Sequence, residues 1–283
     1  MAGLVVGVDV GGTKALLLAS RGVEAVSERR IATGPDFTAP ALVREIAAFL
    51  ESLPAAPEAV GLAVPGIVDD SGRVVACDVL RGLDGFLFTL SGIQTVVLND
   101  TAAALVAARA DFAPAATAAL VMVGTAIGAA FQMNGVVARG AKGWAGELGY
   151  VPIQMQGGVQ RLDDVAGGAA ILKRCGLSAQ ELSNGLASQD ERLLELVKDA
   201  GRGLGLRLAT LINLLNPELI VLGGGTLAYS GYVQAALEQA QASSLPDLWR
   251  CCRVTITPHG ERLVAHGAAL AARANAGPQR ANS

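Results

Sequence analysis

The stretch Val5–Ala19 places the strongest constraint on how this chain can fold. It begins with the apolar run Val5–Val8, continues through Asp9 and the glycine pair Gly11-Gly12, and ends in a second apolar run, Leu16–Leu18. Short β-branched and aliphatic runs predict strands, and adjacent glycines permit the positive φ angles of a tight turn. Glycines also leave backbone N–H groups uncovered. We therefore predict a strand-turn-strand hairpin that can hold an anionic group.

Three kinds of phosphate-binding turn compete for this stretch, and the order of its residues separates them. A Rossmann turn requires Gly-x-Gly-x-x-Gly before a helix, and that spacing is absent. A P-loop requires a final Gly-Lys-Ser/Thr, whereas Gly12 is followed by Thr13-Lys14 and then by a strand. The third kind is a phosphate hairpin in which Asp9 faces a metal ion, as in the superfamily of sugar kinases, heat-shock chaperone ATPases and actin. An ordinary turn is the alternative, so residues further along the chain decide.

The composition describes a folded globular protein. The 283 residues are 52% hydrophobic and 17% charged, which argues against disorder and allows one large core or two lobes. A formal net charge of -3 with scattered Lys and Arg gives no reason to expect a nucleic-acid partner. No signal segment and no apolar run of membrane-span length is visible, so we expect a cytoplasmic protein without a membrane partner.

Two further strands end in polar or glycine residues that are candidates for a site. The apolar run Ala59–Val64 leads into Pro65-Gly66, and Val96–Leu98 delivers Asn99-Asp100 onto an Ala-rich helix. Open α/β sheets bind ligands at the carboxyl ends of their strands, which makes Asp100 a candidate catalytic residue. Asn and Asp are also favoured at helix N-termini, and the capping and catalytic roles can coexist.

The pattern then starts again after a polar break before Pro114. A buried strand is predicted over Ala118–Val123, a glycine-bearing turn over Gly124–Gly128, and a return strand over Ala129–Met133. A second phosphate hairpin of this kind is typical of a duplicated fold that grips a polyphosphate from both sides. We therefore predict an N-terminal lobe over 1–112, which the predicted C-terminal helix at 264–276 is a candidate to join, and a C-terminal lobe over 113–283.

The second half carries a further loop and a triple glycine that suit a ligand site. The segment from Arg139 to Pro152 is rich in glycine and contains one carboxylate, Glu147. Helices are predicted over 163–174 and 191–214, and the strand Leu219–Leu222 runs into Gly223-Gly224-Gly225. Three successive glycines allow the backbone to approach a flat ligand.

Taken in order, these segments resemble the ROK family of bacterial sugar kinases over nearly the whole chain. The resemblance implies an α/β actin-like (ribonuclease H-like) fold of two lobes, each a mixed sheet with helices, with a cleft between them. It also implies ATP-dependent phosphorylation of a hexose or N-acylhexosamine, usually at O6, and a homodimer. The matching motifs are Asp9-x-Gly11-Gly12-Thr13-Lys14, Val64-Pro65-Gly66-Ile67-Val68-Asp69, Leu98-Asn99-Asp100, Gly124-Thr125-x-Ile127-Gly128, Arg139-Gly140-Ala141 with Gly146-Glu147-x-Gly149, and Leu222-Gly223-Gly224-Gly225.

The resemblance also assigns roles to single residues. Asp100 would be the general base on the sugar hydroxyl, and Asp9 would hold hydrated Mg²⁺. Phosphoryl transfer needs mainly positioning and charge neutralisation, which backbone N–H groups, Mg²⁺ and one carboxylate supply. The sugar would contact Gly66, Asn99 and Glu147. The nucleotide would contact Gly11, Gly12, Thr13, Lys14, Gly124, Thr125, Gly128, Gly223, Gly224 and Gly225.

The chain departs from the family pattern where the sugar is expected to bind. Tyr150 stands in place of the family's His, and residues 151–162 contain neither Cys nor His, so no zinc site is expected. Asp163 stands where the family has a sugar-binding Glu, and Val79 where many members have an Asn. Tyr150 and Asp163 are candidate sugar contacts in altered form. The alternatives are a kinase for an unusual sugar derivative and a sugar-binding sensor without turnover.

Overall fold

The computed structural model describes residues 3–22, 24–155, 158–258 and 260–276. Contacts among these residues divide the chain into two compact units. Unit 1 comprises Met1–Asp111, Arg139–Trp144 and Glu261–Ser283, and unit 2 comprises Phe112–Ala138 and Ala145–Gly260. No helix among the described residues is long and apolar enough to cross a membrane.

Unit 1 is built on a five-stranded mixed sheet of order β3-β2-β1-β4-β7. Strands β1, β2 and β3 are antiparallel neighbours, whereas β4 pairs in parallel with β1 and with β7. The strands are β1 (Val5–Val10), β2 (Lys14–Arg21), β3 (Glu24–Ala32), β4 (Ala59–Val64), β7 (Gln94–Asn99) and a separate pair, β5 (Ile67–Val68) with β6 (Val74–Ala76). The helices are α1 (Ala39–Glu51), α2 (Asp100–Ala108) and α9 (Leu263–Ala276), with the 3-10 turns η1 (Arg81–Leu83), η2 (Arg109–Asp111) and η5 (Gly260–Arg262).

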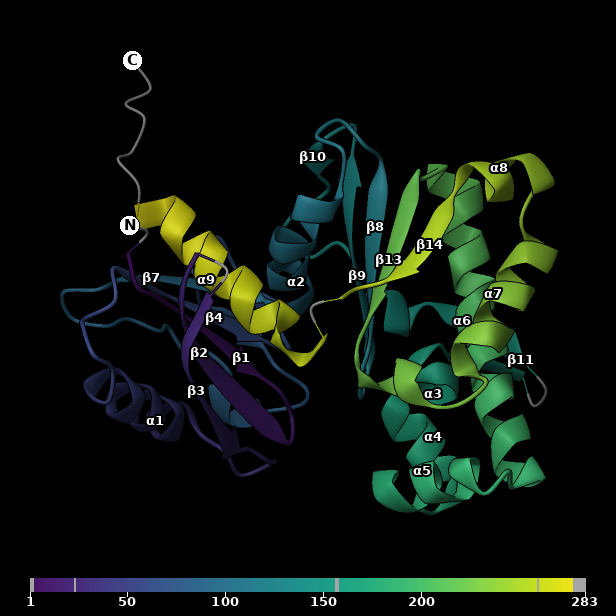
Figure 1. Cartoon of the computed structure of the whole chain (residues 1–283), viewed down its shortest axis with the longest axis horizontal. Coiled ribbons are helices and arrows are strands. Elements are labelled where there is room, and N and C mark those ends of the chain that lie inside the picture. The colour runs from purple at the N-terminus through teal and green to yellow at the C-terminus, as the bar shows by residue number, and fades with distance from the viewer. Residues whose placement is uncertain (1–2, 23, 156–157, 259, 277–283) are drawn as a thin grey trace. The chain divides into compact units, whose positions relative to one another are not determined.

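The alternation of side chains along β1 determines what each face of this sheet meets. Val6, Val8 and Val10 are fully buried in a core that includes the apolar side of α1. The residues between them point to the opposite face, which α9 covers (Figure 1). Asp9 ends this second face, so β1 presents one carboxylate at the carboxyl end of an otherwise apolar strand.

Unit 2 repeats the arrangement with a five-stranded sheet of order β10-β9-β8-β13-β14. The strands are β8 (Ala118–Val123), β9 (Ile127–Met133), β10 (Val136–Val137), β13 (Leu219–Gly223), β14 (Arg253–Ile256) and a separate hairpin, β11 (Pro152–Met155) with β12 (Gly158–Arg161). The helices are α3 (Asp163–Ala166), α4 (Gly168–Cys175), α5 (Ala179–Ala187), α6 (Glu191–Leu215), α7 (Tyr232–Ser243) and α8 (Pro246–Cys251), with the 3-10 turns η3 (Leu148–Tyr150) and η4 (Gly225–Ala228).

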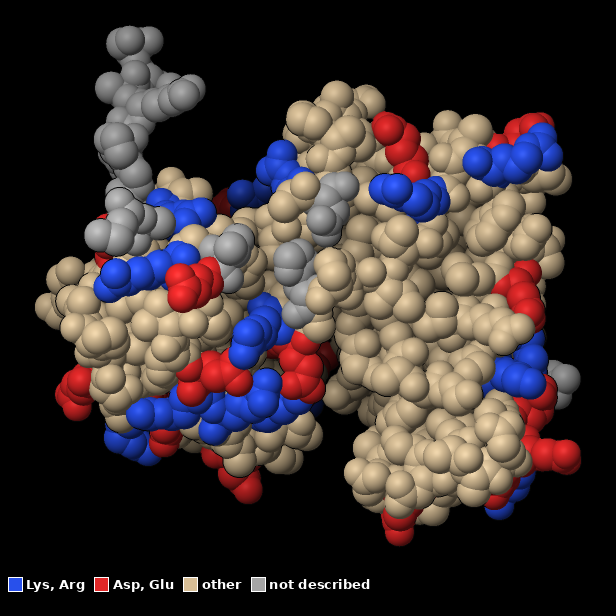
Figure 2. Space-filling view, in the orientation of Figure 1, with Lys and Arg blue, Asp and Glu red and all other residues tan. Residues whose placement is uncertain are grey.

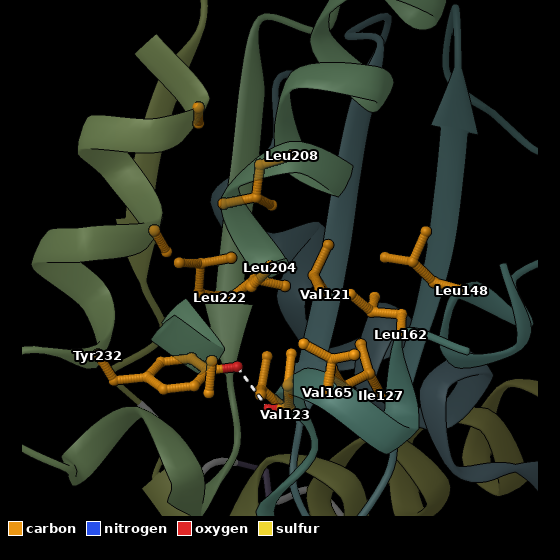
Figure 3. Packing of buried hydrophobic residues seen from close by; sticks show 14 of the residues in the cluster. Val121, Val123, Ile127, Leu148, Leu162, Val165, Leu204, Leu208, Leu222 and Tyr232 are labelled. Atoms are coloured by element: carbon orange, nitrogen blue, oxygen red, sulfur yellow. Dashed lines mark hydrogen bonds between the residues drawn. The ribbon is translucent and has the colours of Figure 1, made fainter. Parts of the chain in front are cut away.

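The core of unit 2 lies between its sheet and the helices α3, α6 and α7 (Figure 3). Aliphatic side chains fill most of it, and Tyr232 brings the largest buried ring. The Tyr232 hydroxyl donates a 2.7 Å hydrogen bond to the carbonyl oxygen of Ala166, which satisfies both buried groups. This bond joins α7 to the end of α3.

The sequence prediction of α/β class with a mixed sheet in each half is confirmed. One predicted helix, 163–174, is wrong in detail because Gly167 takes an extended conformation and divides it into α3 and α4. The break lets the first amides of α4 reach the carbonyls of Gly124 and Thr125, at 2.8 and 3.1 Å. The predicted limits of the two lobes, 1–112 and 113–283, stay a prediction.

Candidate functional site

The first predicted phosphate turn connects β1 to β2 and is supported by β3. The Gly11 amide donates to the Lys14 carbonyl at 2.9 Å, and the Thr33 hydroxyl donates to the Gly11 carbonyl at 2.6 Å. The expectation of positive φ angles here is wrong, since neither Gly11 nor Gly12 has one. The absence of a side chain at position 12 leaves room for Val79, because a Cβ there would lie 2.4 Å from Cγ1 of Val79.

Asp9 lies directly before this turn and carries a strongly perturbed carboxyl group. Its pKa is raised from 3.8 to about 7, first by burial and then by the charge of Asp100; Lys14 opposes the shift and Glu261 adds to it. Two carboxylates that destabilise each other's charge provide a favourable place for a cation. The group expected here is Mg²⁺, which prefers oxygen ligands and keeps several of its waters, so these residues fit it.

Asn99 and Asp100 are placed by the junction of β7 and α2. Asn99 is the N-cap of α2, and its Oδ1 accepts the amides of Thr101 and Ala102 at 2.9 and 3.3 Å. Its Nδ2 donates to the Gly66 carbonyl at 3.1 Å. Asp100 follows in the first helical turn, where the helix dipole favours its negative charge. Asn99 therefore links the predicted sugar loop at Gly66 to the predicted base.

Lys14, a predicted nucleotide contact, is engaged by a residue that the sequence did not indicate. Its Nζ lies 2.7 Å from Oε1 of Glu261, and Arg30 lies 3.3 Å from Oε2 of the same carboxylate. Figure 2 shows basic and acidic side chains interleaved over the part of unit 1 that contains β2 and β3. The side chains of Lys14, Arg30 and Glu261 are at least half exposed, so their two ion pairs contribute little to stability.

The second predicted phosphate turn joins β8 to β9 in unit 2 and is held through its carbonyls. The Gly124 carbonyl accepts from the Gly168 amide at 2.8 Å and from the Thr226 hydroxyl at 2.9 Å. Within the described part of the chain, the amides of Thr125 and Ala126 have no backbone acceptor. The carbonyl of this turn is therefore bonded within the protein, whereas two of its amides have no backbone partner. An anion is bound by backbone N–H donors of this kind.

The triple glycine lies beside this turn. Gly224 has φ 104°, and a Cβ on it would lie 2.3 Å from the Val123 carbonyl oxygen, so only glycine fits between β8 and β13. Gly223 ends β13, and Gly225 begins η4, which carries Thr226. The predicted phosphate turn and the predicted adenosine segment therefore meet within unit 2.

Asp163 serves this turn directly. Its Oδ1 accepts the Ile127 amide at 2.7 Å, and burial raises the pKa of its carboxyl group. Gly149 makes room for it, since a Cβ there would lie 2.2 Å from Oδ1. The structure thus gives Asp163 a supporting role, and its predicted contact with sugar stays a prediction.

Glu147 and Tyr150 lie on the segment around η3. Glu147 is the N-cap residue of η3, and the preceding Gly146 is fixed to β9 by a 2.8 Å bond from the Ala129 amide. Tyr150 is 46% exposed, and the Arg161 guanidinium lies 4.6 Å from its ring centre, a cation-π contact that the sequence analysis did not foresee. No group of three or more His, Cys, Asp or Glu in the described residues could hold a metal ion, and the absence of zinc stays a prediction.

A family model described as the ROK family matches residues 5–275. This chain belongs to the ROK family. The match covers both units, and the ROK fold accounts for their two similar five-stranded sheets. A solved ROK hexokinase from Thermus thermophilus superposes with a TM-score of 0.77 at 27% identity, covering 96% of this chain and 98% of that one.

Two curated relatives show the range of proteins that this ROK chain resembles. A bifunctional enzyme NanE/NanK of Brucella melitensis biotype 1 is 28% identical over 256 residues, which cover 85% of this chain and 49% of the relative. A kanosamine kinase of Amycolatopsis mediterranei is 25% identical over 266 residues, which cover 83% of this chain and 88% of the relative. The chain spans about half the length of the NanE/NanK relatives that it matches.

Several residues of this ROK chain that support the site were not found from the sequence. They are Thr33, which holds the first turn, Glu261, which pairs with Lys14, Thr226, which holds the second turn, and Arg161, which stacks on Tyr150. Thr226 follows the triple glycine directly, and that position was an available signal. Thr33 and Glu261 lie 22 and 247 residues along the chain from their partners, whereas Arg161 reaches Tyr150 through the β11–β12 hairpin.

Proposed function

We propose that this ROK protein is an ATP- and Mg²⁺-dependent kinase that phosphorylates a hexose or N-acylhexosamine, at O6, with Asp100 as the general base. The observation that carries the proposal is the placement of Asp100 at the start of α2, beside Asn99 and within electrostatic range of Asp9. Relatives named hexokinase, kanosamine kinase and NanE/NanK support a sugar as the acceptor.

In this proposal each residue supplies positioning or charge. Asp100 orients the sugar hydroxyl and accepts its proton, while Asn99, Gly66 and Glu147 hold the sugar. Asp9 would hold Mg²⁺ through water, and the ion would neutralise charge on the phosphate oxygens. Amides of Gly11 to Thr13 and of Gly124 to Gly128 would bind phosphates, with Lys14 adding a charge, and Gly223 to Gly225 would accept adenosine.

An acceptor outside the common hexoses is a second candidate, and two observations favour it. The Asp163 carboxylate is committed to the Ile127 amide, and the Tyr150 ring is covered on one side by Arg161. Both residues were candidate sugar contacts, so the part of the acceptor that they would touch is expected to differ from a plain hexose. The acceptor panel should therefore include amino, acylamino and acidic sugars.

The test is ADP formation from Mg-ATP over that panel, with wild type beside Asp100→Asn. We expect sugar-stimulated turnover that falls about 10²- to 10⁴-fold in the variant, the usual cost of losing a general base. Asp36→Asn, a substitution of an exposed loop carboxylate, is the matched control and should leave turnover unchanged. Failure of every sugar to stimulate turnover, or an Asp100→Asn enzyme within a few-fold of wild type, would refute the proposal.

A further inference from the structure

The segment Arg139–Trp144 belongs to unit 1, although the residues on both sides of it belong to unit 2. We call this segment the strap. Its chain direction is set by three glycines with positive φ, namely Gly140 at 70°, Gly143 at 81° and, just beyond it, Gly146 at 121°. Such angles are easily adopted only by glycine, so the backbone conformation of the strap depends on these glycines.

The strap is attached to unit 1 at the β5-β6 hairpin. The indole Nε1 of Trp144 donates to the Val68 carbonyl at 3.3 Å, and Arg139 lies 3.4 Å from Oδ1 of Asp70. The ion pair is 69% and 89% exposed and therefore contributes little. Trp144 is 40% exposed, so its hydrogen bond is less open to solvent than the ion pair and is the stronger of the two attachments.

Val68 lies two residues from Gly66, whose carbonyl is held by Asn99. β5 consists of two residues with an irregular register to β6, and so short a pair depends on contacts from outside it. A shift of β5 would move the Gly66 carbonyl away from the Asn99 amide that also caps α2. A continuous set of contacts thus runs from Trp144 through Val68 and Gly66 to Asn99, next to Asp100.

The other end of the strap leads to Glu147. Only Ala145 and Gly146 separate Trp144 from it, and Gly146 is fixed to β9 of unit 2. The Trp144–Val68 hydrogen bond and the Arg139–Asp70 ion pair both lie away from the turn Gly11–Lys14 in sequence.

We propose that Trp144 is a positioning residue of the acceptor site, which holds the Gly66 loop in place through its bond to Val68. This inference rests on the proposed sugar kinase function. It predicts that loss of the indole lowers kcat/KM for the acceptor and leaves the KM for Mg-ATP unchanged.

The experiment compares wild type, Trp144→Phe and Trp144→Ala, with Trp249→Phe as the matched control in the other tryptophan of the chain. Trp144→Phe removes the donor and keeps a ring, so the acceptor KM should rise about fivefold. Trp144→Ala should lower kcat/KM for the acceptor about 10- to 100-fold through misplacement of the site. The KM for Mg-ATP should stay within twofold in both, and Trp249→Phe should change neither constant.

Hydrogen exchange provides a readout that does not depend on turnover. Both Trp144 variants should speed amide exchange in residues 66–69 and leave it unchanged in residues 24–32 of β3. If wild type phosphorylates no acceptor, the proposed function fails and exchange alone decides the inference. Unchanged exchange in residues 66–69 overturns the inference. An active Trp144→Ala enzyme also overturns it if its acceptor constants match wild type or if its acceptor and ATP constants rise together.

Discussion

Replacing Asp9 by Asn should stabilise the protein in the absence of nucleotide and metal while removing a proposed functional group. The pKa of Asp9 is raised from 3.8 to about 7, with burial as the first cause and the charge of Asp100 as the second. The folded state therefore binds the Asp9 proton more tightly than the unfolded state does. The contribution of Asp9 to the free energy of unfolding is fully present below its unfolded pKa of 3.8. This contribution is lost as the pH rises through about 7, and it stays lost above that pH.

The magnitude follows from the shift. Moving a carboxyl pKa from 3.8 to about 7 costs the folded state about 4 kcal/mol at pH 8, where the group is ionised, and about 1.7 kcal/mol at pH 5. Asn is nearly isosteric and carries no charge at either pH. The stability gained by Asp9→Asn should therefore grow by about 2.5 kcal/mol between pH 5 and pH 8.

Urea unfolding at pH 5, 6, 7 and 8, without Mg²⁺ or nucleotide, measures this difference. Asp100→Asn should give a smaller gain in the same direction, because it removes only the second cause of the shift. Asp36→Asn, a substitution in an exposed loop, is the control variant. The free energy of unfolding of Asp9→Asn could instead differ from that of wild type by a constant amount from pH 5 to pH 8, or be lower than that of wild type at pH 8. Either result would show that ionised Asp9 does not destabilise the folded state.

Two further predictions concern the supports of unit 2. Tyr232→Phe should lower the free energy of unfolding by about 1–3 kcal/mol, because the buried Ala166 carbonyl loses its partner, and urea titration with unchanged m-value checks it. Asp163→Ala should raise the KM for Mg-ATP, since the Ile127 amide loses its acceptor and the second turn is no longer fixed. Asp163→Asn keeps an acceptor oxygen and should raise the KM less, so equal constants in the two variants would contradict the assigned role.

Local patterns in the sequence were enough for much of the framework. Apolar runs of strand length bounded by glycine located β1, β2, β4, β8 and β13, and Asn99-Asp100 was placed at the start of a helix. These predictions succeed because strand propensity, helix capping and turn chemistry act over a few neighbouring residues. The same signals, taken in order, also indicated the ROK family.

The tertiary structure decided how the site residues are held. Asp163 reaches an amide 36 residues away, Trp144 a carbonyl 76 residues away, and Lys14 a carboxylate 247 residues away. The break at Gly167 is likewise accompanied by a long-range contact, since the first amides of α4 meet the carbonyls of the second turn. Such contacts depend on how whole elements pack, and no local pattern encodes them. The sequence by itself therefore determined which residues and turns are present, while the packing decided which side chains hold the two turns and their neighbours in place.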